Sequence, residues 1–240
     1  MRVITPTLAT GLSLGLLLVS LSAHPALAAD EMASLVALEP VRALVRHSHL
    51  ANFEQERASP DVRHVADWVV GTNDNHNMPF LIVDKTNAKV FVFHADGRLR
   101  GAASALLGLA VGDDAVPGIG ERKLSSIRPE ERTTPAGRFE AALGRNLSGG
   151  EILWVDYATA ISLHPVITSN ARERRAERLA TPSPLDNRIS YGCINVPADF
   201  FRDVVHAALK GSNGIVYVLP ETRSVRQVFN SNDMGAVPVH

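Results

Sequence analysis

Residues 188–197 have the sequence Arg-Ile-Ser-Tyr-Gly-Cys-Ile-Asn-Val-Pro, and this stretch indicates most about the fold and its chemistry. It contains Cys193, the only cysteine among the 240 residues. Gly192 permits a tight backbone turn and a close approach of substrate. A helix is predicted directly after this stretch, and the partial positive charge of its N-terminus would favour the thiolate of Cys193. The stretch therefore predicts a nucleophilic cysteine, and a passive buried thiol is the alternative.

A cysteine nucleophile needs a general base, and His164 is the best candidate among the histidines. It lies in residues 160–167, an apolar run that is typical of a strand, and it precedes Cys193 in the chain. His206 lies inside the helix predicted after Cys193, and the other histidines lie in the N-terminal segments, the first hairpin or the tail. Alternatively, His164 is a structural histidine whose hydrogen bonds are satisfied within the fold.

Away from this stretch, the sequence alternates between short β-rich runs and turns. Residues 80–84 (FLIVD) and 89–93 (KVFVF) predict a hairpin, because two runs rich in β-branched and aromatic residues flank a short turn. Further strands are predicted at 99–111, 137–143, 151–157 and 215–219, and a long loop at 112–129. Helices are predicted from Ser59-Pro60-Asp61 onward, at 170–180 and at 197–210. The pattern predicts a mainly β fold with a few helices, which is an α+β class.

The first 28 residues resemble a secretory signal peptide. Arg2 supplies positive charge, residues 12–21 are apolar, and Ala26-Leu27-Ala28 fits the cleavage rule, so the mature chain would begin at Ala29 or Asp30. A retained N-terminal anchor is the alternative, although the apolar stretch is short for a membrane span. The chain then divides into a helical N-terminal segment (30–75), a catalytic domain (77–220) and a C-terminal tail (221–240). We expect an exported protein with no transmembrane segment in its mature form.

The composition narrows the class of protein further. A net charge of -1 argues against nucleic-acid binding, because contacts to phosphates need a clear basic excess. With a single cysteine no internal disulfide can form, so the stability of the domain must come from its core. The sequence has no His-Glu-x-x-His motif and no pair of cysteines that would predict a metal site. We expect a monomer without a metal or cofactor.

Two motifs and the hairpin, in their order along the chain, resemble the catalytic domain of the L,D-transpeptidase (YkuD-type) family. Ser190-Tyr-Gly-Cys-Ile-Asn195 resembles the family signature of Ser or Thr, any residue, Gly, Cys, a hydrophobic residue and Asn or Arg, which follows a histidine and a gap. Thr134-Pro-Ala-Gly-Arg-Phe139 resembles the Thr-Pro-x-Gly-x-Phe element that precedes that signature. The resemblance covers residues 77–220 and implies a mainly β, sandwich-like catalytic domain.

The resemblance also implies an activity. Enzymes of this family act on peptidoglycan stem peptides, where they cleave the bond between a diamino acid and D-alanine and transfer the acyl group to an amine. The resemblance implies Cys193 as the nucleophile and His164 as the base, a location in the periplasm or at the cell wall, and acylation by carbapenems. The acceptor stays open: a cross-linking amine, water, a D-amino acid or a lipoprotein lysine.

The remaining motif residues would support these two. Gly192 and the backbone N–H groups around Tyr191 are implied as oxyanion donors, and Ser190 as a support of the loop. Asn195 is implied to position the loop or the substrate. Arg188 is predicted to bind a substrate carboxylate or, alternatively, to face solvent.

The chain departs from the family pattern in three respects. Between His164 and Ser190 lie 25 residues, 165 to 189, which is longer than the usual gap. Its charged segment 170–180 predicts an inserted lid or, alternatively, a solvated helix face. Pro165 follows the histidine at a position where Gly or Ser is common, and no wall-binding module is recognisable.

Two other functions therefore stay open. A thiol L,D-carboxypeptidase or amidase would form the same acyl-enzyme but give it to water. A non-catalytic cell-wall-binding protein of the same fold would need neither base nor nucleophile, and the long gap and Pro165 would favour it.

Overall fold

The computed structural model describes residues 50–230. The predicted signal peptide (1–28), residues 30–49 of the predicted helical segment and residues 231–240 of the predicted tail lie outside this part of the chain. Within residues 50–230, no helix has the length and apolar character needed to cross a membrane. The fold is mainly β with a few short helices, which confirms the class predicted from the sequence.

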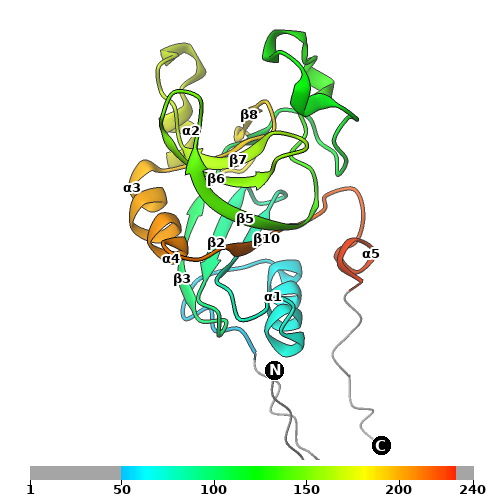
Figure 1. The fold of residues 1–240 in the computed structure, drawn as a ribbon, viewed down its shortest axis with the longest axis vertical. Helices are drawn as coiled ribbons and strands as arrows, with labels where there is room; N and C mark the ends of the chain where they lie inside the picture. Colours follow the sequence, from blue (N-terminus) through cyan, green and yellow to red (C-terminus); the bar gives the residue numbers. More distant parts are fainter. Residues whose placement is uncertain (1–49, 231–240) are drawn as a thin grey trace, which may run out of the picture. The chain divides into compact units, whose positions relative to one another are not determined.

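Eight strands form one mixed sheet in the order β3-β2-β1-β10-β5-β6-β7-β9 (Figure 1). Their bounds are β1 (Phe80–Asp84), β2 (Lys89–Phe93), β3 (Leu99–Ser104), β5 (Gly137–Arg145), β6 (Glu151–Asp156), β7 (Ile161–Pro165), β9 (Ile194–Val196) and β10 (Gly214–Val218). A second sheet pairs β4 (Leu107–Gly108) with β8 (Arg188–Ser190) in parallel. The last strand, β10, lies in the middle of the large sheet, parallel to β1 and antiparallel to β5.

The predicted hairpin is confirmed, and β1 pairs with β2 from Phe80 opposite Phe93 to Asp84 opposite Lys89. All five residues of β1 are buried, because both faces of the sheet are covered. Successive side chains of a strand point to opposite faces. Leu81 therefore enters one core, whereas Phe80 enters another.

The first core lies between the two halves of the sheet. Leu81 of β1 shares this core with Leu153 of β6 and Leu163 of β7, and Figure 1 shows β5, β6 and β7 above β2 and β10. Phe201 and Val205, from the helical segment after Cys193, belong to the same core. A single folded-over sheet thus makes the sandwich-like arrangement that the sequence predicts.

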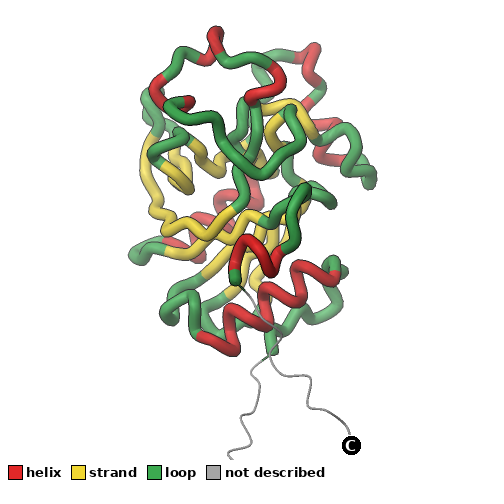
Figure 2. Tube along the Cα trace, turned by 90° about the vertical axis from the view of Figure 1, so that its right-hand side faces the viewer, coloured by secondary structure: helices red, strands yellow, loops and turns green. Residues whose placement is uncertain are grey.

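The second core lies on the opposite face, under two helices. The helix α1 (Pro60–Thr72) begins where Ser59 accepts a hydrogen bond from the N–H of Val62, as its sequence predicts. It contributes Val62 and Val69, and α5 (Val225–Phe229) contributes its two terminal residues. Figure 2 shows these two helices side by side beneath the strands.

The other helical segments are short. The predicted helix at 197–210 is made of α3 (Ala198–Phe200), a π-helical segment (Phe201–His206) and α4 (Ala207–Leu209). The predicted helix at 170–180 is a 3-10 turn (Ala171–Glu173) followed by α2 (Arg175–Ala180). The predicted loop 112–129 contains 3-10 turns at Ile119–Glu121 and Leu124–Ser126, and a third, Pro129–Glu131, begins at its last residue.

Two segments differ from the sequence-based expectation. The strand expected at 99–111 is divided. β3 ends at Ser104, and the backbone N–H and C=O of Leu106 form hydrogen bonds with the backbone of Asn195 instead. Residues 221–230, expected to be a polar tail, include α5, whose Val225 and Phe229 are buried. Ser224 caps this helix, and two apolar residues four positions apart lie on one face of it.

A buried ionic cluster ties the long loop to the sheet and to the C-terminal segment. The Nζ of Lys85 donates hydrogen bonds to Asp113 Oδ1 at 2.9 Å and to the Thr134 carbonyl at 3.0 Å. Asp113 also accepts hydrogen bonds from the backbone N–H groups of Glu221 and Thr222. Burial would raise the pKa of the Asp113 carboxyl, but these donors outweigh it and hold that pKa well below its usual range. The cluster therefore anchors both ends of the loop 112–132.

Candidate active site

Parallel pairing of β7 with β9 brings a histidine and the cysteine together, although they lie far apart in the sequence. His164 on β7 lies opposite Asn195 on β9, and Cys193 directly precedes β9. Side chains two residues apart on a strand share a face. Cys193 and Asn195 are therefore on the same face as His164 and Ser162, and the Ser162 Oγ lies 3.6 Å from the Cys193 Sγ.

His164 and Cys193 each shift the pKa of the other. Burial would raise the pKa of the Cys193 thiol, but hydrogen bonding and the charge of His164, with a contribution from Ser162, lower that pKa below its usual value. Burial would likewise lower the pKa of His164, but hydrogen bonding and the negative charge of Cys193 raise it. Each group thus stabilises the charged form of the other, which favours a thiolate beside an imidazolium.

The backbone orients the imidazole of His164. Its Nδ1 lies 2.8 Å from the carbonyl oxygen of Pro165. Because a carbonyl only accepts hydrogen bonds, Nδ1 carries the proton and Nε2 is the nitrogen that can take up another. Proline has the same carbonyl as Gly or Ser, so the departure from the family pattern at this position leaves the support of the imidazole in place.

The loop before the cysteine is held from two sides. The Ser190 hydroxyl accepts a hydrogen bond from the Gly192 N–H at 3.0 Å and donates one to the Cys193 carbonyl at 2.6 Å. The Thr134 hydroxyl, which is fully buried, donates to the Gly192 carbonyl at 2.8 Å. The two motifs that resemble the transpeptidase family therefore contact each other. The Gly192 N–H is already bonded within the loop, so it does not point to an incoming oxyanion.

Asn195 connects the pair to a segment that the sequence predicts as an inserted lid. Its Nδ2 lies 3.2 Å from the Cys193 carbonyl and 3.4 Å from the His164 Nε2. Its Oδ1 accepts a hydrogen bond from the Arg175 Nη1 at 2.7 Å. Arg175 begins α2, so this segment contacts a residue of the candidate site.

The guanidinium of Arg188 is engaged in hydrogen bonds within the protein. It donates hydrogen bonds to Glu221 and to the Lys85 carbonyl, the latter at 3.0 Å. Only 16% of the Arg188 side chain is exposed. These contacts favour neither the predicted binding of a substrate carboxylate nor the alternative of a solvent-facing arginine. They join Arg188 to the buried cluster around Lys85.

The helix after Cys193 does not lie next to the sulfur. The strand β9 (Ile194–Val196) intervenes, and α3 begins at Ala198 with Pro197 as its cap. Three extended residues carry the chain about 10 Å, and the effect of a helix dipole falls off within one turn. The expectation that this helix would stabilise the thiolate is therefore wrong, and His164 and Ser162 supply the stabilisation instead.

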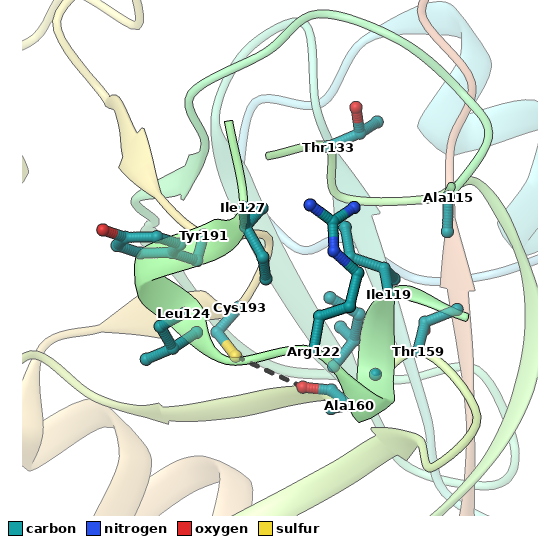
Figure 3. A pocket seen from close by; sticks show the side chains of 12 residues that line it. Ala115, Ile119, Arg122, Leu124, Ile127, Thr133, Thr159, Ala160, Tyr191 and Cys193 are labelled. Atoms are coloured by element: carbon teal, nitrogen blue, oxygen red, sulfur yellow. Dashed lines mark hydrogen bonds between the residues drawn. The ribbon is translucent and has the colours of Figure 1, made fainter. Parts of the chain in front are cut away.

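A pocket of about 70 Å³ lies beside Cys193. Figure 3 shows the Cys193 Sγ at its lower edge, directed toward the Ala160 carbonyl, at a distance of 3.7 Å. The loop 112–132 supplies one wall, with the apolar side chains of Ile119, Leu124 and Ile127. Tyr191 lines the pocket as well, and the Arg132 guanidinium carbon lies 3.9 Å from the centre of its ring. Cys193 is partly exposed, so a ligand in this pocket reaches the sulfur.

We expect Cys193 to react with iodoacetamide at pH values at which an ordinary thiol is protonated. A lowered thiol pKa means that the thiolate persists as the pH falls below about 8.5, and the reaction slows only at the lower pKa of Cys193. The measurement is the rate of alkylation between pH 4 and pH 10, on the order of one point per half pH unit. In a His164→Ala variant the midpoint should move up toward the ordinary range. Equal midpoints in the two proteins would contradict the pairing.

The sequence does not predict the roles of Ser162 and Arg175. Ser162 carries a usable signal, because it precedes His164 by two residues on the same predicted strand and must share its face. Arg175 carries none, because it is one of four arginines within residues 170–180 and nothing in the pattern distinguishes it from its neighbours.

No family profile and no curated protein sequence matches this chain. Solved structures resemble it at low identity. They include the LD transpeptidase LdtMt1 in complex with imipenem (17% identity, TM-score 0.36, 59% of this chain and 58% of that one). They also include the helical cell shape determining protein Pgp2 from Campylobacter jejuni (16%, TM-score 0.41, 65% and 55%) and the catalytic domain of an E. faecium L,D-transpeptidase (18%, TM-score 0.33, 60% and 98%). The chain thus spans less than two thirds of the first two, and the similarity concerns the fold.

Proposed function

We propose that this protein is a cysteine-dependent L,D-transpeptidase that acts on peptidoglycan stem peptides. The observation that carries the proposal is the parallel pairing of β7 with β9, which places His164 and Ser162 on the same face as Cys193. The lowered pKa of Cys193 and the raised pKa of His164 are consistent with this arrangement. The sequence motifs around Thr134 and Cys193, which resemble this family, support the choice of substrate. The signal-like residues 1–28 support an action in the periplasm or at the cell wall.

In the first half-reaction, His164 takes the proton of the Cys193 thiol, and the sulfur attacks the carbonyl carbon between the diamino acid and D-alanine. A C–S bond forms, and the carbonyl oxygen takes up the electron pair of the broken C=O π bond. When this oxyanion collapses, the C–N bond breaks and D-alanine leaves with the proton held by His164. The product of this step is a thioester on Cys193.

In the second half-reaction, an acceptor amine attacks the thioester and gives its proton to His164. A new amide bond forms, the C–S bond breaks, and Cys193 leaves as the thiolate. The backbone N–H groups of Tyr191 and Cys193 are the donors that we assign to the oxyanion, because the Gly192 N–H is bonded to Ser190.

The pocket beside Cys193 would receive part of the stem peptide. Its lining is mostly apolar but includes Arg122, and its small size suits the methyl group and carbonyl of a D-alanine residue. The loop that forms one wall is anchored at both ends by the Lys85 cluster, so the wall is in place before substrate binds.

The direct test is incubation of the purified protein with a disaccharide-tetrapeptide muropeptide, with products separated by chromatography and identified by mass. We expect release of D-alanine and formation of cross-linked dimers. Tripeptides without dimers would identify a carboxypeptidase that shares the intermediate but passes it to water. A protein that releases no D-alanine and forms no covalent adduct with a carbapenem would contradict an enzymatic function.

A further inference from the structure

We propose that Arg175 is a positioning residue of the candidate active site, which holds the Asn195 amide so that its NH₂ group faces His164 and the Cys193 carbonyl. A role of Arg175 in catalysis rests on the proposed function, whereas the orientation of the buried Asn195 amide can be tested without it. Arg175 comes from the 25 residues, 165 to 189, that separate the candidate base from the cysteine motif.

The direction of the amide follows from the donors around it. A guanidinium only donates hydrogen bonds, and the Arg175 Nη1 lies 2.7 Å from Asn195 Oδ1. The amide oxygen must therefore face Arg175, and the NH₂ group must face the other way. There it lies 3.2 Å from the Cys193 carbonyl and 3.4 Å from the His164 Nε2.

Arg175 is itself held in place. Its Nε donates a hydrogen bond to Glu173 Oε2 at 2.5 Å, and only 13% of its side chain is exposed. Asn195 is 1% exposed, so its amide has no water with which to exchange partners freely. A buried amide with three protein partners keeps one orientation as long as all three remain.

The orientation bears on the chemistry of His164. An N–H group directed at Nε2 favours the neutral imidazole, because an imidazolium would present a second N–H to the same donor. Two groups with charge or a titrating proton act on this ring: Cys193 from the loop before β9 and Arg175 from α2. Glu173 is bonded to Arg175. The positive charge of Arg175 also lowers the pKa of His164, whereas Cys193 raises it. Arg175 thus limits the rise in the pKa of His164, so that the imidazolium can give its proton to the leaving group.

The test compares Arg175→Met with Arg172→Met. Arg172 lies in the same segment and is exposed, so its loss removes the same charge without touching Asn195. The pKa of the His164 imidazole is measured by NMR titration of its ring protons, and the alkylation rate of Cys193 is measured over the same pH range. We expect Arg175→Met to raise the His164 pKa by about 0.5–1 unit, and Arg172→Met to leave it within about 0.2 unit.

The same pair of substitutions in an Asn195→Ala background separates the amide from the charge of Arg175. If Arg175 acts through the amide, its loss should shift the His164 pKa much less once the amide is gone. An equal shift with and without Asn195 would overturn the proposal, and so would an unchanged titration in Arg175→Met at an unchanged far-UV spectrum. The titration uses no substrate, so its outcome is independent of whether the wild-type protein turns over muropeptides.

Discussion

Replacing Cys193 with alanine is expected to abolish the release of D-alanine from a tetrapeptide muropeptide and to leave the fold intact. The acyl group has no comparable nucleophile to accept it, because this is the only cysteine in the sequence and an unactivated hydroxyl such as that of the adjacent Ser162 is a weak nucleophile. Loss of a nucleophile typically lowers turnover by about 10⁴-fold or more. The measurement is product formation over hours, with detection by mass.

The thermal midpoint of the Cys193→Ala protein serves as its control. The side chain is partly exposed, so its truncation should change the stability by about 1 kcal/mol or less, which is a shift of about 2–4 °C for a domain of this size. Cys193→Ser is matched in size and should also be inactive, because an unactivated hydroxyl is a poor nucleophile. A carbapenem should add its mass to the wild-type protein alone. Full activity in Cys193→Ala would refute the mechanism.

The second large effect is expected for Gly192→Ala, in stability as well as in activity. Gly192 has a φ of 126°, which side-chain-bearing residues rarely adopt. A Cβ placed there would lie 2.8 Å from the Thr133 carbonyl oxygen and 2.7 Å from the Ile161 Cδ1. Backbone strain costs about 1–3 kcal/mol and overpacking a similar amount, so we expect a loss of about 2–5 kcal/mol in the free energy of unfolding.

Gly149→Ala is the matched control for this prediction. Gly149 also has a positive φ, of 80°, but no atom lies within 4 Å of its added Cβ. Chemical denaturation of both variants separates backbone strain from collision. If Gly149→Ala and Gly192→Ala lower the free energy of unfolding by the same amount, the close packing of the cysteine loop against Thr133 and Ile161 does not contribute to the effect.

Patterns in the sequence predict those helices and strands whose formation depends mainly on residues that are close together in the chain. The hairpin of β1 and β2 follows from two β-rich runs around a short turn, and the two strands pair as a hairpin in the structure. The start of α1 follows from Ser59 as a cap with proline after it. The tail is different: α5 has only five residues, and its burial depends on the distant α1 and β10.

The candidate site is predictable only in part, for a physical reason. Cys193 stands out as the only cysteine, and His164 as the histidine in an apolar, strand-like run, but their proximity depends on the parallel pairing of β7 with β9. Strand pairing across an intervening segment leaves no periodic mark in either strand. The same holds for the bond from Arg175 to Asn195, which depends on how α2 lies against the sheet.

The place of β10 in the middle of the sheet has a consequence for biogenesis. While a ribosome is still adding residues before 214, β1 and β5 each lack a neighbour and present unpaired N–H and C=O groups. Joining β1 to β10 closes a very long stretch of chain, which makes assembly slow. A nascent polypeptide with an export signal of the kind predicted at 1–28 would therefore remain unfolded, and able to pass through a translocon, until synthesis is almost complete. A chain that ends after the cysteine motif would lack β10, and the edges of β1 and β5 would keep unpaired backbone groups that favour aggregation.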